Sequence, residues 1–146
     1  MPDAISGAFT TTNHDILNVL TSNVTVISSI DPNKPRLEAN AVWDTGAMCS
    51  VISNAIANKL NLSPVSIKVI GTPSGIMDAN MYVIDLLLPN GIEVKRLRVL
   101  GAYPSGSDML IGMDVISLGD FAVTNYLNQT AFSFQIPSKS RIDFTK

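Results

Sequence analysis

Cysteine and histidine are almost missing from this sequence, which has one of each, Cys49 and His14, in 146 residues. A single cysteine excludes an internal disulfide framework and the paired-cysteine spacing of a structural zinc site. One histidine also argues against most metal sites, so we expect neither a metal nor an organic cofactor. An isolated cysteine fits a reducing compartment, and we expect a cytoplasmic protein.

Charge and long apolar runs are scarce as well. Charged residues make up 15% of the chain and the net charge is -2, so the broad positive field of a nucleic-acid-binding protein is missing. The most apolar stretch, residues 82–88, is interrupted by Asp85 and followed by Pro89, which is far short of a membrane span. Residues 1–7 lack the basic and apolar blocks of a secretory signal. We therefore expect no nucleic-acid partner and no membrane association.

The apolar fraction, 46%, is enough to form a core in a chain of this length. We expect a flexible N-terminal tail over residues 1–13 and a single domain over residues 14–146.

Short runs rich in β-branched residues, bounded by turn formers, predict that strands dominate. Two prolines separate the first two runs, which predicts a hairpin. A second hairpin has a glycine-bearing tip at residues 71–75, and Asn90-Gly91 supplies the positive φ values of a tight turn after it. The predicted strands are 24–30, 39–43, 65–70, 81–88, 92–100, 121–126 and 131–136.

Two segments have helical character instead. Ile52, Ile56 and Leu60 are spaced by four, which predicts a short amphipathic helix capped by Ser50 or Ser53. Residues 113–118 predict one or two helical turns closed by Gly119. The expected fold class is mostly β with one or two short helices.

Asp44-Thr45-Gly46 is the motif that carries chemistry. It directly follows the apolar strand that ends at Trp43 and directly precedes the first predicted helix. An Asp-Thr-Gly triplet also occurs by chance, and an ordinary polar turn closing a strand has the same composition. The rest of the chain decides between these interpretations.

From about Val24 to Pro137 the sequence resembles the retroviral-type, or retropepsin-like, aspartic proteases, particularly their bacterial members. The resemblance rests on residues 41–47, Ser50, the glycine-containing hairpin, residues 110–114 and the Phe-Ser-Phe strand before Pro137. It implies a closed acid-protease barrel with a flap hairpin, in which Asp44, Thr45 and Gly46 form the catalytic loop. Met48 and Cys49 depart from the family pattern, which bears on specificity more than on chemistry.

The resemblance also implies a substrate-binding surface beside the catalytic loop. Its expected members are Ala47, Ile70, Gly71, Thr72, Pro73, Ser74, Gly75 and Ile111, with residues 71–75 at the tip of a mobile flap. Without the resemblance, the same residues describe an ordinary surface hairpin. The aliphatic side chains among them favour peptides cut between apolar residues.

Hydrolysis by an aspartic protease requires two carboxyl groups, one to activate water and one to polarise the scissile carbonyl. The chain has one Asp-Thr-Gly motif, whereas the two-domain pepsins have two such motifs in a longer chain. A complete site therefore requires a homodimer in which two Asp44 side chains share one proton. We expect a peptide or protein substrate and a bell-shaped pH profile with an acidic optimum.

Three alternatives compete with this interpretation. Asp114 would be a second catalytic carboxylate in the same chain, although its place after Gly112 favours a helix-capping role. Cys49 and His14 would form a nucleophile and base pair, although nothing in the sequence brings them together. In the third alternative, the domain binds peptides or dimerises without cutting them, or it is an enzyme that stays latent until its N-terminal tail is removed or dimerisation is triggered.

Overall fold

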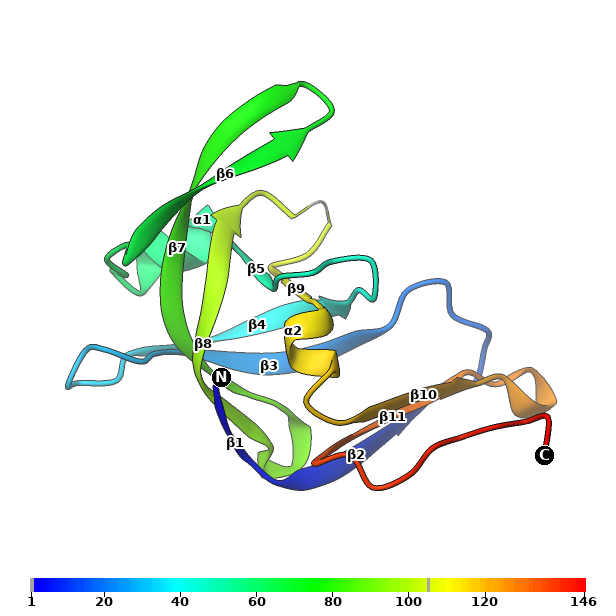
Figure 1. The fold of residues 1–146 in the computed structure, drawn as a ribbon. Helices are drawn as coiled ribbons and strands as arrows, with labels where there is room; N and C mark the ends of the chain where they lie inside the picture. Colours follow the sequence, from blue (N-terminus) through cyan, green and yellow to red (C-terminus); the bar gives the residue numbers. More distant parts are fainter. Residues whose placement is uncertain (1, 105) are drawn as a thin grey trace.

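The computed structural model describes residues 2–104 and 106–146, and this part of the chain contains eleven strands and two short α-helices. The mostly β fold class predicted from the sequence is confirmed (Figure 1). The strands are β1 (Asp3–Ile5), β2 (Gly7–Thr12), β3 (Thr21–Ser28), β4 (Arg36–Trp43), β5 (Val51–Ser53), β6 (Ser66–Thr72), β7 (Gly75–Leu87), β8 (Glu93–Ala102), β9 (Met109–Ile111), β10 (Asp120–Thr124) and β11 (Ala131–Ile136).

Six of these strands close into a barrel. Their order in the larger sheet is β8-β5-β9-β4-β3-β7, and pairing of β7 with β8 completes the ring. The β6–β7 hairpin extends beyond the barrel, and β1 pairs with the first residues of β8 (Figure 1). The predicted closed barrel with a projecting hairpin is therefore confirmed.

The predicted hairpins form with the expected turns. Strands β3 and β4 pair from Thr21↔Val42 to Ile27↔Arg36. A short 3-10 turn, η1 (Pro89–Gly91), joins β7 to β8, with φ of 59° at Asn90 and 76° at Gly91. Strand β7 starts at Gly75, six residues earlier than predicted, because pairing with β6 continues to the hairpin tip.

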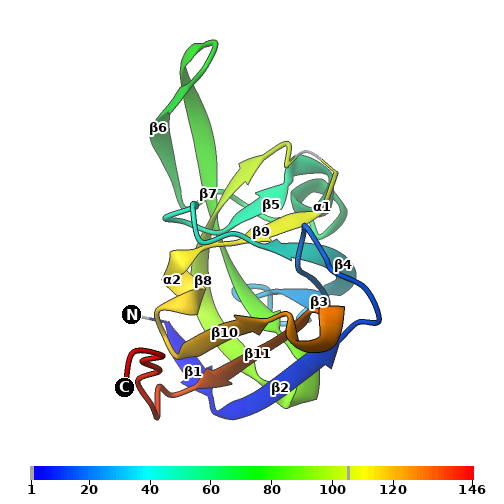
Figure 2. The same cartoon turned by 90° about the vertical axis from the view of Figure 1, so that its right-hand side faces the viewer.

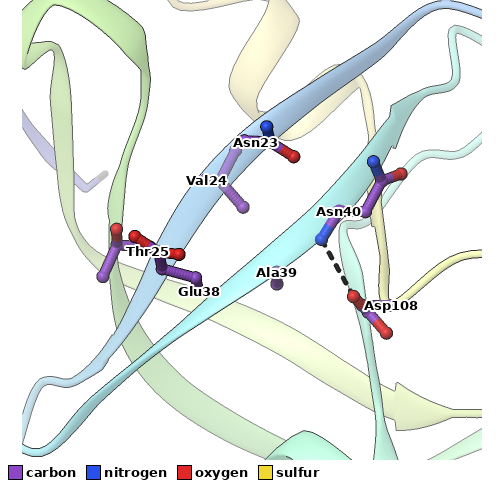
Figure 3. Close-up of a pocket in the computed structure, with 7 residues that line it drawn as sticks. All are labelled: Asn23, Val24, Thr25, Glu38, Ala39, Asn40 and Asp108. Carbon is purple, nitrogen blue, oxygen red and sulfur yellow. Dashed lines mark hydrogen bonds between the residues drawn. The ribbon is translucent and has the colours of Figure 1, made fainter.

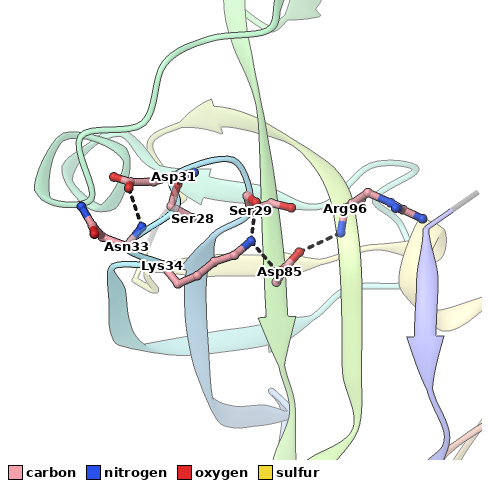
Figure 4. Close-up of polar contacts among 7 residues, drawn as sticks. All are labelled: Ser28, Ser29, Asp31, Asn33, Lys34, Asp85 and Arg96. Carbon is pink, nitrogen blue, oxygen red and sulfur yellow. Dashed lines mark hydrogen bonds and ion pairs between the residues drawn. The ribbon is translucent and has the colours of Figure 1, made fainter.

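Buried Asp85 explains an irregularity between β7 and β8. Its Oδ1 accepts a hydrogen bond of 2.9 Å from the Arg96 backbone N–H, and Lys34 Nζ lies 3.9 Å from Oδ2 (Figure 4). The register shifts between Ile84 and Leu86, and Arg96 adopts a φ of 55°. The bulge thus directs a backbone donor at a buried carboxylate whose other partner, Lys34, is half-exposed.

The N-terminal residues differ from the prediction. Residues 3–12, expected to belong to a flexible tail, form β1 and β2. Strand β2 pairs with β11 in a separate three-stranded sheet of order β10-β11-β2. Both partners of this segment, β8 and β11, come much later in the chain, so no local pattern in residues 1–13 predicts the pairing.

Aromatic residues join the small sheet to the barrel. Trp43 stacks on Phe121 at 5.1 Å between ring centroids, and Phe9 meets Phe132 edge-on at 6.0 Å. The Trp43 Nε1–H donates to Ser22 Oγ at 2.9 Å, so its polar atom is satisfied inside the core. Burying each such ring is worth roughly 1.5–3 kcal/mol, which makes this cluster a main source of stability.

Both predicted helices are present. Helix α1 (Asn54–Lys59) is capped by Ser53, whose side chain accepts from the Ile56 N–H, and it buries Ile56 and Ala57. A 3-10 turn, η2 (Tyr126–Asn128), links β10 and β11, and helix α2 (Met113–Ile116) precedes β10. Among the described residues, no helix has the length and hydropathy needed to cross a membrane.

Candidate active site

Asp44 follows β4, where β4 lies between β3 and β9 in the barrel. Residues 44–50, here called the Asp44 loop, connect β4 to β5. The Asp44 N–H donates to the Ile111 carbonyl at 2.8 Å, next to the Trp43↔Ile111 pair of the parallel β4–β9 ladder. The sheet itself therefore fixes the backbone at Asp44.

The turn inside the loop holds one carboxylate oxygen. The Gly46 N–H donates to Asp44 Oδ1 at 2.8 Å, and the Ala47 N–H donates to the Asp44 carbonyl at 3.2 Å. A Cβ at Gly46 would lie 3.2 Å from Oδ1, so a side chain there would crowd the carboxylate. Thr45 and Gly46 are exposed and Asp44 is half-buried, so the turn lies at the surface.

Gly112 closes the loop from the other side. The Met113 N–H donates to the Ala47 carbonyl at 2.7 Å. A Cβ at Gly112 would lie 2.7 Å from that same carbonyl oxygen and 3.0 Å from the backbone carbon of Cys49. Only glycine allows β9 and α2 to approach the loop this closely.

Ser50 and Asp114 lock the end of the loop. Ser50 is fully buried; its Oγ donates to Asp114 Oδ1 at 2.7 Å and its N–H donates to Oδ2 at 2.9 Å. The Gly112 N–H in turn donates to Ser50 Oγ at 3.0 Å. Asp114 thus has a structural role, although it binds Ser50 more than it caps α2. Sequence reasoning missed this pair because its members are 64 residues apart.

Cys49 and His14 belong to separate contacts. The Cys49 Sγ lies 3.9 Å from the Arg98 carbonyl, and partial burial together with the Asp114 charge raises the pKa of the thiol. The residues on either side of His14 are bound to Thr130. The Asn13 N–H donates to the Thr130 carbonyl, and the Thr130 N–H donates to the Asp15 carbonyl. These contacts give no support to a thiol nucleophile paired with this histidine.

The expected substrate-binding residues fall into two groups. Ala47 belongs to the Asp44 loop, while the Ile111 side chain is fully buried and meets the loop through its carbonyl. Ile70 of β6 packs against a small cluster formed by Ala79, Met81 and Leu100. The remaining expected residues, 71–75, form the hairpin tip, which stands away from the Asp44 loop in Figure 1.

A cavity of about 370 Å³ lies between the hairpin and the end of β8. Ile70, Thr72 and Met77 line it from the hairpin, and Gly101 and Tyr103 line it from the other side. Sequence reasoning did not select Met77 or Tyr103. The sequence offers one signal for this cavity, which is that Tyr103 is an aromatic residue in an otherwise polar loop after β8.

A second cavity, of about 350 Å³, lies over β3 and β4 and contains no residue of the Asp44 loop (Figure 3). Its polar side chains include Asn23, Glu38 and Asp108, and Asp108 Oδ2 accepts from the Asn40 N–H at 2.9 Å. That bond fixes the loop before β9, so the carboxylate serves the fold.

Comparison with known proteins places these features in a family. The model of the gag-polyprotein aspartyl protease family matches residues 34–118, more than half of the chain, including the Asp44 loop and Gly112. The chain therefore belongs to this family. A search of curated proteins finds no significant match.

The chain is also similar to solved structures, one of which shares its fold. A retropepsin-like aspartic protease from Rickettsia conorii superposes with a TM-score of 0.59 at 14% identity, covering 90% of this chain and 96% of that one. The simian foamy virus (mac) protease gives 0.46 at 16% identity, with 66% and 91% covered. The EIAV protease in complex with the inhibitor HBY-793 gives 0.48 at 19% identity, with 70% and 89% covered. The retropepsin-like fold predicted from the sequence is confirmed by the first of these.

Proposed function

We propose that the protein is an aspartic endopeptidase that acts as a homodimer, with one Asp44 from each subunit. The observation that carries the proposal is the Asp44 loop, in which an exposed Asp-Thr-Gly turn is held by both the Ile111 carbonyl and Gly112. Membership of an aspartic protease family supports the same activity.

The two carboxyl groups would share one proton across a twofold axis. One takes a proton from the attacking water while the other donates to the scissile carbonyl oxygen. The Gly46 N–H donates to Asp44 Oδ1, so Oδ2 is available to bind water or the second carboxyl group. The exposed Thr45 hydroxyl is available to bond to the loop of the partner subunit and hold the two carboxyl groups coplanar.

The substrate would be an extended peptide that lies between the Asp44 loop and the hairpin. Its backbone adds to strand edges, and closure of the β6–β7 hairpin excludes water. The cavity lined by Ile70, Met77 and Tyr103 has mixed apolar character and favours an aliphatic or aromatic substrate side chain. The free thiol of Cys49 further supports a reducing, cytoplasmic setting.

A peptide-binding or latent module is the alternative. Under this alternative the domain keeps the loop and the dimer but does not hydrolyse peptides. The intact Asp44-Thr45-Gly46 triplet and its hydrogen bonds favour the active enzyme.

Cleavage of a mixed peptide library from acidic to neutral pH, with the wild type and Asp44→Asn side by side, tests the proposal. We expect a bell-shaped profile with an acidic optimum for the wild type and a loss of at least about 10²-fold for the variant. Sedimentation should show that both proteins form dimers. If both proteins cut equally, the aspartic mechanism is wrong; if neither cuts while both dimerise, the alternative is correct.

A further inference from the structure

Basic side chains gather in a cavity between the β3–β4 loop and β8. The cavity has a volume of about 410 Å³, and small-molecule sites typically have volumes of about 300–1,000 Å³. Four of the ten lysines and arginines of the chain line it, namely Lys34, Arg36, Lys95 and Arg96. The chain as a whole has a net charge of -2, so this cavity is a local concentration of positive charge.

Strand pairing builds the floor of this basic cavity. Ile27 of β3 is directly opposite both Arg36 of β4 and Asp85 of β7, and directly opposite residues share one face of a sheet. The neighbouring residues Val26 and Leu86 are fully buried in the core, and successive side chains along a strand point to opposite faces. The row from Arg36 to Asp85 therefore lies on the outer face of the barrel.

Two of the basic residues have an unusual backbone conformation. Lys34 has a φ of 47° and Arg96 a φ of 55°, in the left-handed region that few residues other than glycine adopt. They reach buried Asp85 from opposite sides, where Lys34 Nζ lies 3.9 Å from Oδ2 and the Arg96 N–H donates to Oδ1 at 2.9 Å (Figure 4). Strained residues are concentrated at functional sites and ligand clamps. The fold thus holds two cations beside the basic cavity in strained conformations.

Most of the positive charge of the basic cavity is available to a ligand. The Arg96 guanidinium points away from the buried carboxylate in Figure 4 and pairs with Asp3. Both members of that pair are exposed, so solvent weakens it. Within residues 2–104 and 106–146, Arg36 and Lys95 form no ion pair. An anion can therefore bind these three cations without breaking a buried contact.

The lining favours a compact ligand with several negative charges. Asp85 and Glu93 also line the cavity, and their charges oppose the binding of a single carboxylate. A phosphate group carries a charge of about −1.5 to −2 at neutral pH, and it accepts paired hydrogen bonds from an arginine. The cations come from the β3–β4 loop, β4 and β8 and converge on one space. Two or more linked phosphate groups match this arrangement.

We propose that the basic cavity binds a small anion with two or more phosphate groups, held by Arg36, Lys95 and Arg96 with support from Lys34. The inference goes beyond the proposed function and does not depend on it. The cavity and the Asp44 loop are at opposite ends of β4, and a strand of this length puts about 25 Å between them. The β3–β4 loop projects at the left of Figure 1, whereas the small sheet β10-β11-β2 lies at the right there and in front in Figure 2.

Calorimetric titration of the full chain with inorganic tripolyphosphate tests the proposal. The double variant Arg36→Gln, Lys95→Gln removes two exposed cations of the basic cavity, so it should fold normally. The matched control is Lys139→Gln, Arg141→Gln, which removes one exposed lysine and one exposed arginine outside the cavity. We expect the double variant to bind tripolyphosphate at least about tenfold more weakly than the wild type, and the control to bind like the wild type.

Glu93→Gln should change the affinity in the opposite direction. Because it removes a carboxylate that repels the anion, we expect tripolyphosphate to bind about two- to fivefold more tightly. A merely structural role of the basic residues would not produce this gain. Tripolyphosphate should also raise the melting temperature of the wild type and of Glu93→Gln, but not that of the double variant.

Three results would overturn the proposal. If the double variant and its control bind tripolyphosphate equally, the anion is attracted by the surface in general and not by the cavity. If the wild type does not bind tripolyphosphate at millimolar concentration, the cavity is not a phosphate site. If a hexaglutamate peptide binds the wild type more tightly than tripolyphosphate does, the cavity receives an acidic protein segment instead. None of these results changes the proposed protease, which Asp44→Asn tests separately.

Discussion

The Asp44 loop and the tip of the β6–β7 hairpin are both short connections between strands, yet they are held in different ways. The loop is fixed by Ile111, Gly112 and Asp114, at the end of β9 and the start of α2, and these contacts include its own last residue, Ser50. Within the described residues, the side-chain bonds of the tip are local, such as Thr72 Oγ1 to the Gly75 carbonyl at 2.8 Å. The proposed protease requires this difference, because its carboxylate must be held in place while its hairpin must be able to close.

Glycines at the two sites give the sharpest contrast. Gly112→Val should destabilise the protein by about 1–3 kcal/mol or more, because its Cβ would collide with the backbone at Ala47 and Cys49. Gly71→Ala should change stability by less than about 1 kcal/mol, since no atom lies within 4 Å of the added Cβ.

Chemical unfolding of both variants measures the difference. If Gly112→Val is as stable as Gly71→Ala, the loop is not closed by the contacts described here.

Removing one hydroxyl group from the Asp44 loop and one from the hairpin tip should give a second, smaller difference in stability. Ser50→Ala should cost about 1–3 kcal/mol, because it leaves the Gly112 N–H without its partner and removes one of the two hydrogen bonds to Asp114 Oδ1. It should also lower activity, since the Asp44 loop loses its anchor at β5. Thr72→Ala removes a hydroxyl bond on the exposed tip and should cost well under 1 kcal/mol.

Unfolding and peptide cleavage, measured on the same two variants, check this prediction. Equal losses of stability would mean that the loop and the tip are held with the same strength.

The smallest expected effect is on the alkylation rate of the Cys49 thiol, which lies in the Asp44 loop. Burial and the Asp114 carboxylate raise its pKa, so the reactive thiolate forms only at higher pH than in a free cysteine. Alkylation by iodoacetamide at pH 8 should therefore be several-fold slower than that of free cysteine and should rise with pH. Asp114→Asn removes the negative charge, lowers the pKa and should speed alkylation at that pH.

Mass spectrometry of the alkylated protein over a pH series gives the rate. Alkylation as fast as that of free cysteine would show that the loop does not shelter the thiol.

The sequence predicted the features that local pattern determines. The Asn90-Gly91 turn, the Ser53 cap and the β3–β4 hairpin follow from residues next to one another, and each is present. The Asp44 turn was identified by its position after an apolar strand and by the resemblance to a family.

The rest depends on contacts between distant segments. Strands β1 and β2 pair with β8 and β11, so residues 3–12 resemble a tail when they are considered alone. Ser50 and Asp114 meet only because β5 and β9 pair in the barrel. Cavity residues such as Tyr103 could not be assigned for the same reason.

A subunit-mixing experiment tests the central claim, that two Asp44 side chains form one site. Wild-type protein is mixed with increasing amounts of Asp44→Asn at constant total concentration, equilibrated and assayed for peptide cleavage. Because mixed dimers would lack one carboxyl group, activity should fall as the square of the wild-type fraction. A linear fall would show that each subunit cuts on its own and would contradict the shared site.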